Sequence, residues 1–61
     1  MNQPATIIIV DDVAANRETL VALLEAPDVR LIEAPNGAEA LRLAAESPPD
    51  LILLDIMMPG M

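Results

Sequence analysis

Three aspartates stand where two hydrophobic segments end, and their carboxylates are the groups in this chain best suited to chemistry. Asp11 and Asp12 follow the run Ile7–Val10, and Asp55 follows the run Leu51–Leu54. The carboxyl ends of parallel strands share one edge of a sheet, so the three acids would meet there if the two runs were neighbouring strands. Carboxylates held close together resist ionisation unless a cation neutralises them.

Magnesium is the cation that best suits such a cluster of three aspartates. It prefers oxygen ligands, and it often combines one or two carboxylates with water and a substrate phosphate. With the metal bound, one carboxylate is free to attack phosphorus as a nucleophile. Phosphoryl transfer needs mainly positioning and charge neutralisation, and the metal contributes to both. The aspartates therefore predict a magnesium site beside a phosphate-accepting carboxylate.

Three strands are expected to position these acids. Two of them, over residues 6–11 and 51–54, are continuous apolar runs, which is typical of parallel strands covered on both faces. The third, over residues 29–34, is interrupted by Arg30 and Glu33, which favours a place at the edge of the sheet.

Two helices are expected between the strands. Apolar residues at helical spacing predict a helix over residues 13–26, with Asp12 as its N-cap. A second helix over residues 38–46 is opened by Asn36, with Glu39 completing a capping-box-like pair. The small apolar face of this second helix, which would lie against the sheet, comprises Ala40, Leu41, Ala44 and Ala45. The alternation of strands and helices predicts an α/β fold with a parallel sheet and right-handed crossovers.

Composition excludes several classes of protein. At 54% hydrophobic residues, the chain is too apolar for a disordered segment. Ten acidic and three basic residues give a net charge of −7, the opposite of what nucleic acids and anionic membrane surfaces attract. The apolar runs are too short to span a bilayer, and no basic segment precedes the first run, so we expect a cytoplasmic protein. Neither a GxGxxG nor a Walker A motif is present, which argues against a nucleotide site.

The segments IIIVDD, NGAEAL and DLILLDIMMPGM resemble the first half of a response-regulator receiver domain of two-component signalling. The resemblance extends from Thr6 to Met61 and implies a flavodoxin-like doubly wound sheet with strand order 2-1-3. It implies that Asp55 is the phosphoacceptor. Its implied magnesium ligands are the carboxylates of Asp11, Asp12 and Asp55 and the backbone carbonyl of Met57. The implied partner is a histidine kinase or a phosphotransfer protein.

The family's domain is longer, with a hydroxyl residue ending its fourth strand and a lysine ending its fifth. The 61 residues contain no lysine, and their hydroxyls, Thr6, Thr19 and Ser47, fall in other elements. We therefore expect residues 1–61 to be a truncated receiver domain that is deficient in switching. The third strand would be an exposed hydrophobic edge, which predicts a homodimer joined through that edge.

Other interpretations remain beside this one. Each aspartate alone fits a strand end or a helix cap. The whole chain could be a silent structural fragment that only oligomerises. An aspartyl-phosphate phosphatase of the haloacid-dehalogenase type is disfavoured, because that class needs a second aspartate where this chain has Met57, so we expect no enzyme. Asn16 and Arg17 could approach a phosphoryl group, but a solvated helix face is the interpretation that we favour for them.

Overall fold

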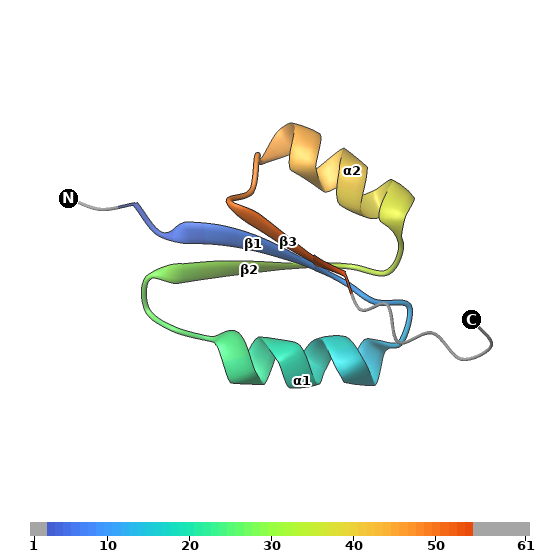
Figure 1. Ribbon diagram of the computed structural model, residues 1–61, viewed down its shortest axis with the longest axis horizontal. Coiled ribbons are helices and arrows are strands. Elements are labelled where there is room, and N and C mark those ends of the chain that lie inside the picture. The colour runs from blue at the N-terminus through green and yellow to red at the C-terminus, as the bar shows by residue number, and fades with distance from the viewer. Residues whose placement is uncertain (1–2, 55–61) are drawn as a thin grey trace.

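Residues 3–54, the part of the chain that the computed structural model describes, alternate between strand and helix (Figure 1). The elements are β1 (Ala5–Val10), α1 (Ala14–Leu24), β2 (Val29–Ala34), α2 (Gly37–Glu46) and β3 (Leu51–Leu54). The strands are parallel and lie in the order β2-β1-β3. The expected α/β class, the strand order 2-1-3 and the edge position of β2 are therefore confirmed.

Element boundaries agree with the expected ones to within one residue, except at the end of α1. Strands β2 and β3 have the expected bounds, whereas β1 begins and ends one residue earlier. Helix α1 starts at Ala14 rather than residue 13, and it stops at Leu24 because Glu25 is already extended. The expected cap of α2 is confirmed, since the Asn36 side chain accepts a hydrogen bond from the Glu39 amide at 2.8 Å.

The expected helix cap by Asp12 is wrong. The N-cap position belongs to Val13, and in the described structure no side chain caps α1. The Val13 amide instead donates to Oδ1 of Asp11 at 2.9 Å. The acid that helps to organise this turn is therefore the one at the end of the strand, and the side chain of Asp12 is not used to start the helix.

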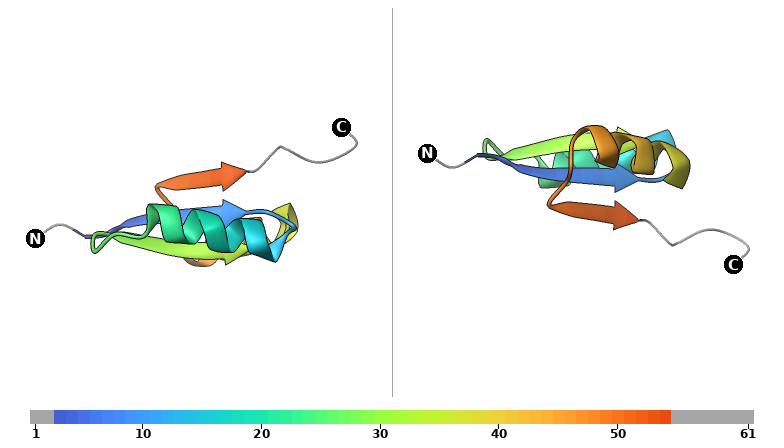
Figure 2. Two further views of the ribbon diagram at one scale, coloured as in Figure 1. Left: turned by 90° about the horizontal axis from the view of Figure 1, so that it is seen from below. Right: turned by 90° about the horizontal axis from the view of Figure 1, so that it is seen from above.

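The two helices cover opposite faces of the sheet (Figures 1 and 2). Each of them contacts β1 and β2, whereas β3 contacts only β1 among the described elements. Figure 2 shows β3 at the side of β1 that faces away from β2. The helices thus bury the centre and one edge of the sheet, and they leave the other edge open.

The core lies mainly between the sheet and α2. Side chains alternate between the two faces along each strand, so one face carries the buried cluster Ile8, Val10 and Ala34, closed by Ala40 of α2. Leu43 and Ala44 pack against it, but Leu41 is 72% exposed, so its expected place against the sheet is wrong. Leu43 and Ala44 follow Ala40 by three and four residues and so share its side of the helix, whereas Leu41 follows it by one residue and does not.

The other face and the β3 edge are less completely covered. Ile9, on the α1 face, is fully buried, but none of the residues of α1 is. Four large apolar side chains of α1 and β3 are well exposed: Leu23 (75%), Leu51 (49%), Ile52 (41%) and Leu54 (63%). The exposure expected for the third strand is thus confirmed. Over residues 3–54, neither helix has the length and hydropathy that crossing a membrane requires.

Candidate functional site

A small hollow of about 170 Å³ lies at the carboxyl edge of the sheet. The ends of β1 and β3, the turn that follows β2 and the start of α2 contribute to it. Its lining residues are Val10, Asp11, Asp12, Pro35, Asn36, Gly37 and Leu54. Strands β2 and β3 lie on opposite sides of β1, so the strand order reverses at β1, and the carboxyl edge at such a point is where a doubly wound sheet binds its ligand.

Asp11 is the most firmly held residue of the hollow. Only 7% of it is exposed. Its amide donates to the carbonyl of Ala34 at 3.2 Å, which extends the β1–β2 ladder by one step. Its carboxylate accepts from the Val13 amide, and its carbonyl oxygen accepts from Nη1 of Arg17 at 2.6 Å. The backbone and the side chain of Asp11 are therefore fixed relative to β2 and to the start of α1.

Asp12 differs from Asp11 in exposure. It lines the same hollow but is exposed to solvent, and its carboxylate is not used as a helix cap. The pair thus presents one buried carboxylate and one accessible carboxylate at the same edge. This arrangement suits a hydrated cation, because the buried acid can be fixed by the fold while the exposed acid adapts to the metal.

Arg17 does not lie on a solvated helix face, so our favoured interpretation of this residue is wrong. Its side chain is 17% exposed. Besides the bond to the Asp11 carbonyl, its Nε donates to Oε1 of Glu33 at 3.3 Å. Glu33 pairs in register with Ile9, and it therefore lies on the face that α1 covers. The sequence signal for this pair was a glutamate on the α1 face of a strand and an arginine one turn into α1.

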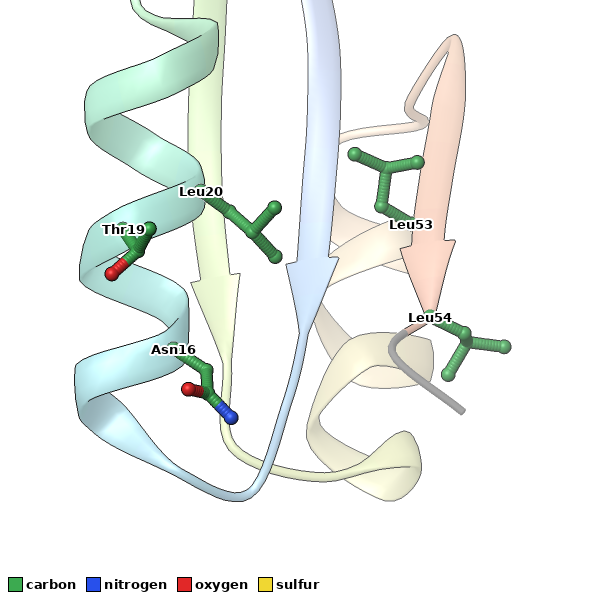
Figure 3. Close-up of a pocket in the computed structure, with 5 residues that line it drawn as sticks. All are labelled: Asn16, Thr19, Leu20, Leu53 and Leu54. Atoms are coloured by element: carbon green, nitrogen blue, oxygen red, sulfur yellow. The ribbon is translucent and has the colours of Figure 1, made fainter. Parts of the chain in front are cut away.

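Asn16 is exposed, in agreement with the solvated helix face that we favoured for it. Together with Thr19 and Leu20 of α1, and with Leu53 and Leu54 of β3, it lines a groove of about 400 Å³. Figure 3 shows Leu20 and Leu53 pointing into the space between α1 and β3, and Leu54 pointing away from α1. The groove is mainly apolar and belongs to the incompletely covered side of the sheet.

The residues at the carboxyl edge fit a magnesium ion as far as the structure describes them. The donors of Asp11 and Asp12 are carboxylate oxygens, which magnesium prefers. Two further predicted ligands, Asp55 and Met57, lie outside the described residues. Within residues 3–54 there is accordingly no group of three or more acidic, histidine or cysteine side chains that could hold a metal. Leu54 lines the hollow, and Asp55 is the next residue in the sequence.

Comparison with known proteins agrees with this geometry. The family model for the response regulator receiver domain matches residues 7–61. The response regulator PleD of Caulobacter vibrioides is 49% identical over 93% of this chain, which corresponds to 13% of PleD. The nitrate/nitrite response regulator NarL of Escherichia coli is 46% identical over 97% of the chain and 28% of NarL. The chain thus spans only a minor part of the length of these relatives.

A solved structure shows the same fold. A chain in the crystal structure of the P1 domain of CheA3 in complex with CheY6, from R. sphaeroides, superimposes with a TM-score of 0.77. The sequence identity is 43%, and the match covers 98% of this chain and 49% of the other. Sequence motifs, strand order and the acids at the carboxyl edge all lead to one assignment: the chain belongs to the family of response regulator receiver domains.

Proposed function

We propose that this chain is the phosphoacceptor module of a two-component phosphorelay, with Asp55 as the residue that accepts the phosphoryl group. The observation that carries the proposal is the hollow at the carboxyl edge, where Asp11, Asp12 and Leu54 meet. Because Asp55 directly follows Leu54 in the sequence, a nucleophilic carboxylate comes immediately after a residue that lines the hollow. Membership of the receiver family supports the same role.

Magnesium is the proposed cofactor. Its ligands would be the carboxylates of Asp11, Asp12 and Asp55 and the backbone carbonyl of Met57. When bound, the metal would neutralise the acids and draw charge from the phosphoryl oxygens. The chain's own contribution is to hold the acids at one edge, with Asp11 fixed through its amide, its carbonyl and its side chain.

The proposed phosphoryl donor is a phosphohistidine of a histidine kinase or of a phosphotransfer protein. A carboxylate oxygen of Asp55 forms the new bond to phosphorus as the phosphorus–nitrogen bond breaks, and the electron pair stays on the imidazole. The structural relative crystallised with the P1 domain of CheA3 supports a partner of this kind.

A signalling role is preferred to an enzymatic one. Met57 stands where a phosphatase of the haloacid-dehalogenase type needs its second aspartate, so we propose a module that is phosphorylated rather than one that turns over a substrate. The 61 residues contain no lysine, and we propose that they accept phosphate without holding the complete switch. We place this activity in the cytoplasm, without nucleic acid or a membrane as a partner, in keeping with the net charge of −7.

We also propose that the 61-residue chain forms a homodimer through the open edge of β3. This strand contacts only β1 among the described elements, and Leu51, Ile52 and Leu54 are exposed. An exposed apolar strand with unpaired backbone groups is a template for pairing with another strand. A second copy of β3 would extend the sheet and cover these side chains.

Mass spectrometry after treatment with acetyl phosphate tests the phosphoacceptor. The unsubstituted chain should gain one phosphoryl group in the presence of magnesium and none after chelation of the metal. Asp55→Asn should abolish the gain. Asp50→Asn is the matched control, because Asp50 lies at the opposite end of β3, where its Oδ2 accepts from the Thr6 amide at 2.7 Å. An adduct that persists in Asp55→Asn contradicts the assignment, and a chain that is never phosphorylated favours the silent structural fragment.

A further inference from the structure

The Arg17 side chain joins three elements close to the acid pair. It comes from α1, its Nη1 donates to the carbonyl of Asp11 at the end of β1, and its Nε donates to Glu33 of β2. Although it carries a charge, this side chain is only 17% exposed. An arginine fork that is largely covered and bonded at two places holds its partners in a defined geometry.

Helix α1 offers no electrostatic stabilisation to a cation at the position of Arg17. A cation near the N-terminus of a helix faces the positive end of the helix dipole. Helix α1 has no acidic residue in its first turn and no side-chain cap in the described structure. Arg17 therefore makes its favourable contacts outside its own helix, with the strand end that carries the acids and with the neighbouring strand.

The bond to the Asp11 carbonyl has a direct consequence for the acid pair. That carbonyl belongs to the planar peptide unit that links Asp11 to Asp12. A donor at 2.6 Å from its oxygen fixes the orientation of this plane, and with it the direction in which the chain continues into Asp12. Glu33 in turn holds the guanidinium from the side of β2.

We propose that Arg17, held by Glu33, is a positioning residue that sets the Asp11–Asp12 peptide for magnesium binding. The inference rests on the proposed magnesium site. Electrostatic repulsion alone predicts the opposite effect. The Arg17 guanidinium repels a nearby metal ion, so removing this charge would tighten magnesium binding. Positioning predicts the reverse sign, since residues that orient metal ligands typically contribute about 10- to 100-fold to affinity.

Magnesium titration of the 61-residue chain by calorimetry shows whether the loss of Arg17 weakens or tightens magnesium binding. Arg17→Met keeps most of the apolar stem and a good helix former but removes the fork. It should weaken magnesium binding by roughly tenfold. Glu33→Gln should weaken it less, because the amide oxygen still accepts a hydrogen bond. Arg42→Met is the matched control and should leave the affinity unchanged, since Arg42 pairs with Glu39 and Glu46 of its own helix.

A readout without metal tests the same turn. Hydrogen exchange of the Val13 amide, which donates to Oδ1 of Asp11, should be faster in Arg17→Met. The Ala40 amide, which donates to the carbonyl of Asn36 at 3.0 Å in α2, should keep its protection. If Arg17→Met lowers protection at both amides, the substitution unfolds the chain, and Glu33→Gln then carries the test through its own magnesium affinity and Val13 exchange.

The possible results separate this inference from the proposed function. Weaker magnesium binding together with faster Val13 exchange supports the positioning role. An unchanged or higher affinity in Arg17→Met, with the fold intact, overturns positioning and leaves the metal site standing. An unsubstituted chain that binds no magnesium overturns the metal site itself, and the positioning role with it.

Discussion

Helices α1 and α2 hold the same sheet from opposite faces, but they are stabilised differently (Figure 1). Helix α2 is capped by Asn36, buries Ala40, and pairs Arg42 with two glutamates of its own helix. Helix α1 has Val13 at its N-cap position without a side-chain cap, and none of its residues is buried. Its Arg17 bonds only to groups of other elements among the contacts described above.

The difference indicates what each side of the sheet does. Helix α2 is stabilised mainly by its own sequence and by the buried cluster beneath it. The place of α1 depends instead on contacts with the turn that carries Asp11 and with β2, so the helix and the acid pair should become ordered together. Segments with few buried apolar contacts open at a lower free energy than the core does, and functional elements are often of this kind.

The largest expected effect concerns the open edge beside α1. Leu51→Lys should raise the dissociation constant of the proposed dimer by at least roughly tenfold, because like charges facing each other across paired strands oppose association. Leu51 is 49% exposed and lies at the start of β3, at the end of the strand away from the acid pair. Sedimentation velocity over a range of protein concentrations measures the constant.

Leu23→Lys is the control for this experiment. It makes the same change of net charge at a side chain that is 75% exposed on α1 and outside the sheet edge. Edge pairing predicts that Leu23→Lys leaves the dimer nearly unchanged. If Leu23→Lys dissociates the dimer and Leu51→Lys does not, the copies meet through the α1 face. A monomeric unsubstituted chain would contradict self-association altogether.

The sequence predicted the features that depend on short stretches of chain. The continuous aliphatic runs gave the positions of β1 and β3, although in the described structure helices cover both faces of β1 and neither face of β3. The Asn36 cap followed from one side chain and the amide three residues later. The acid pair at the carboxyl edge followed from strand direction, which a parallel sheet fixes.

The features that were missed depend on side chains distant in sequence or on the orientation of one residue. Arg17 and Glu33 are 16 residues apart, and only the packing of α1 on β2 brings them together. Asp12 looked like a helix cap, but the turn uses the carboxylate of Asp11 in its place. Leu41 looked like a core residue, but the rotation of α2 puts Leu43 there instead. Asp55 and Met57 lie outside the described residues, so their roles stay predictions.

An intermediate effect is expected at the two helix starts. Asn36→Ala should lower the free energy of unfolding by about 1 kcal/mol, because the Glu39 amide loses its side-chain acceptor. Val13→Ser should do the opposite and stabilise the chain by up to about 1 kcal/mol, because Val13 is 46% exposed and provides no cap to α1. Urea denaturation followed by circular dichroism measures both changes.

The magnesium affinity of Val13→Ser decides whether α1 lacks a cap for structural or for functional reasons. If Val13→Ser stabilises the fold and also weakens magnesium binding, the missing cap belongs to the site. If it stabilises the fold and leaves binding unchanged, α1 is only poorly capped. A loss of stability in Val13→Ser would contradict the view that α1 begins without good stabilisation. It would mean that the packing of Val13 already stabilises the start of this helix.

The smallest effect is expected from the ion pairs of α2. The hydrogen bond from Arg42 lowers the pKa of the Glu39 carboxyl below its usual value of 4.5. A carboxyl whose pKa is lower in the folded state contributes stability above its unfolded pKa, and this contribution is lost as the pH falls through the folded value. The advantage of the unsubstituted chain over Arg42→Met should therefore be constant above about pH 5 and shrink below 4.5. Because both side chains are exposed, the change in stability should be small and should fade in high salt.

An NMR titration of the Glu39 carboxyl carbon measures the pKa of this group directly. Arg42→Met should return the midpoint to its usual range, whereas Arg17→Met should not move it. A shift of this midpoint in Arg17→Met would show that the two helices are coupled across the sheet, although Arg17 and Arg42 contact different groups in the described structure.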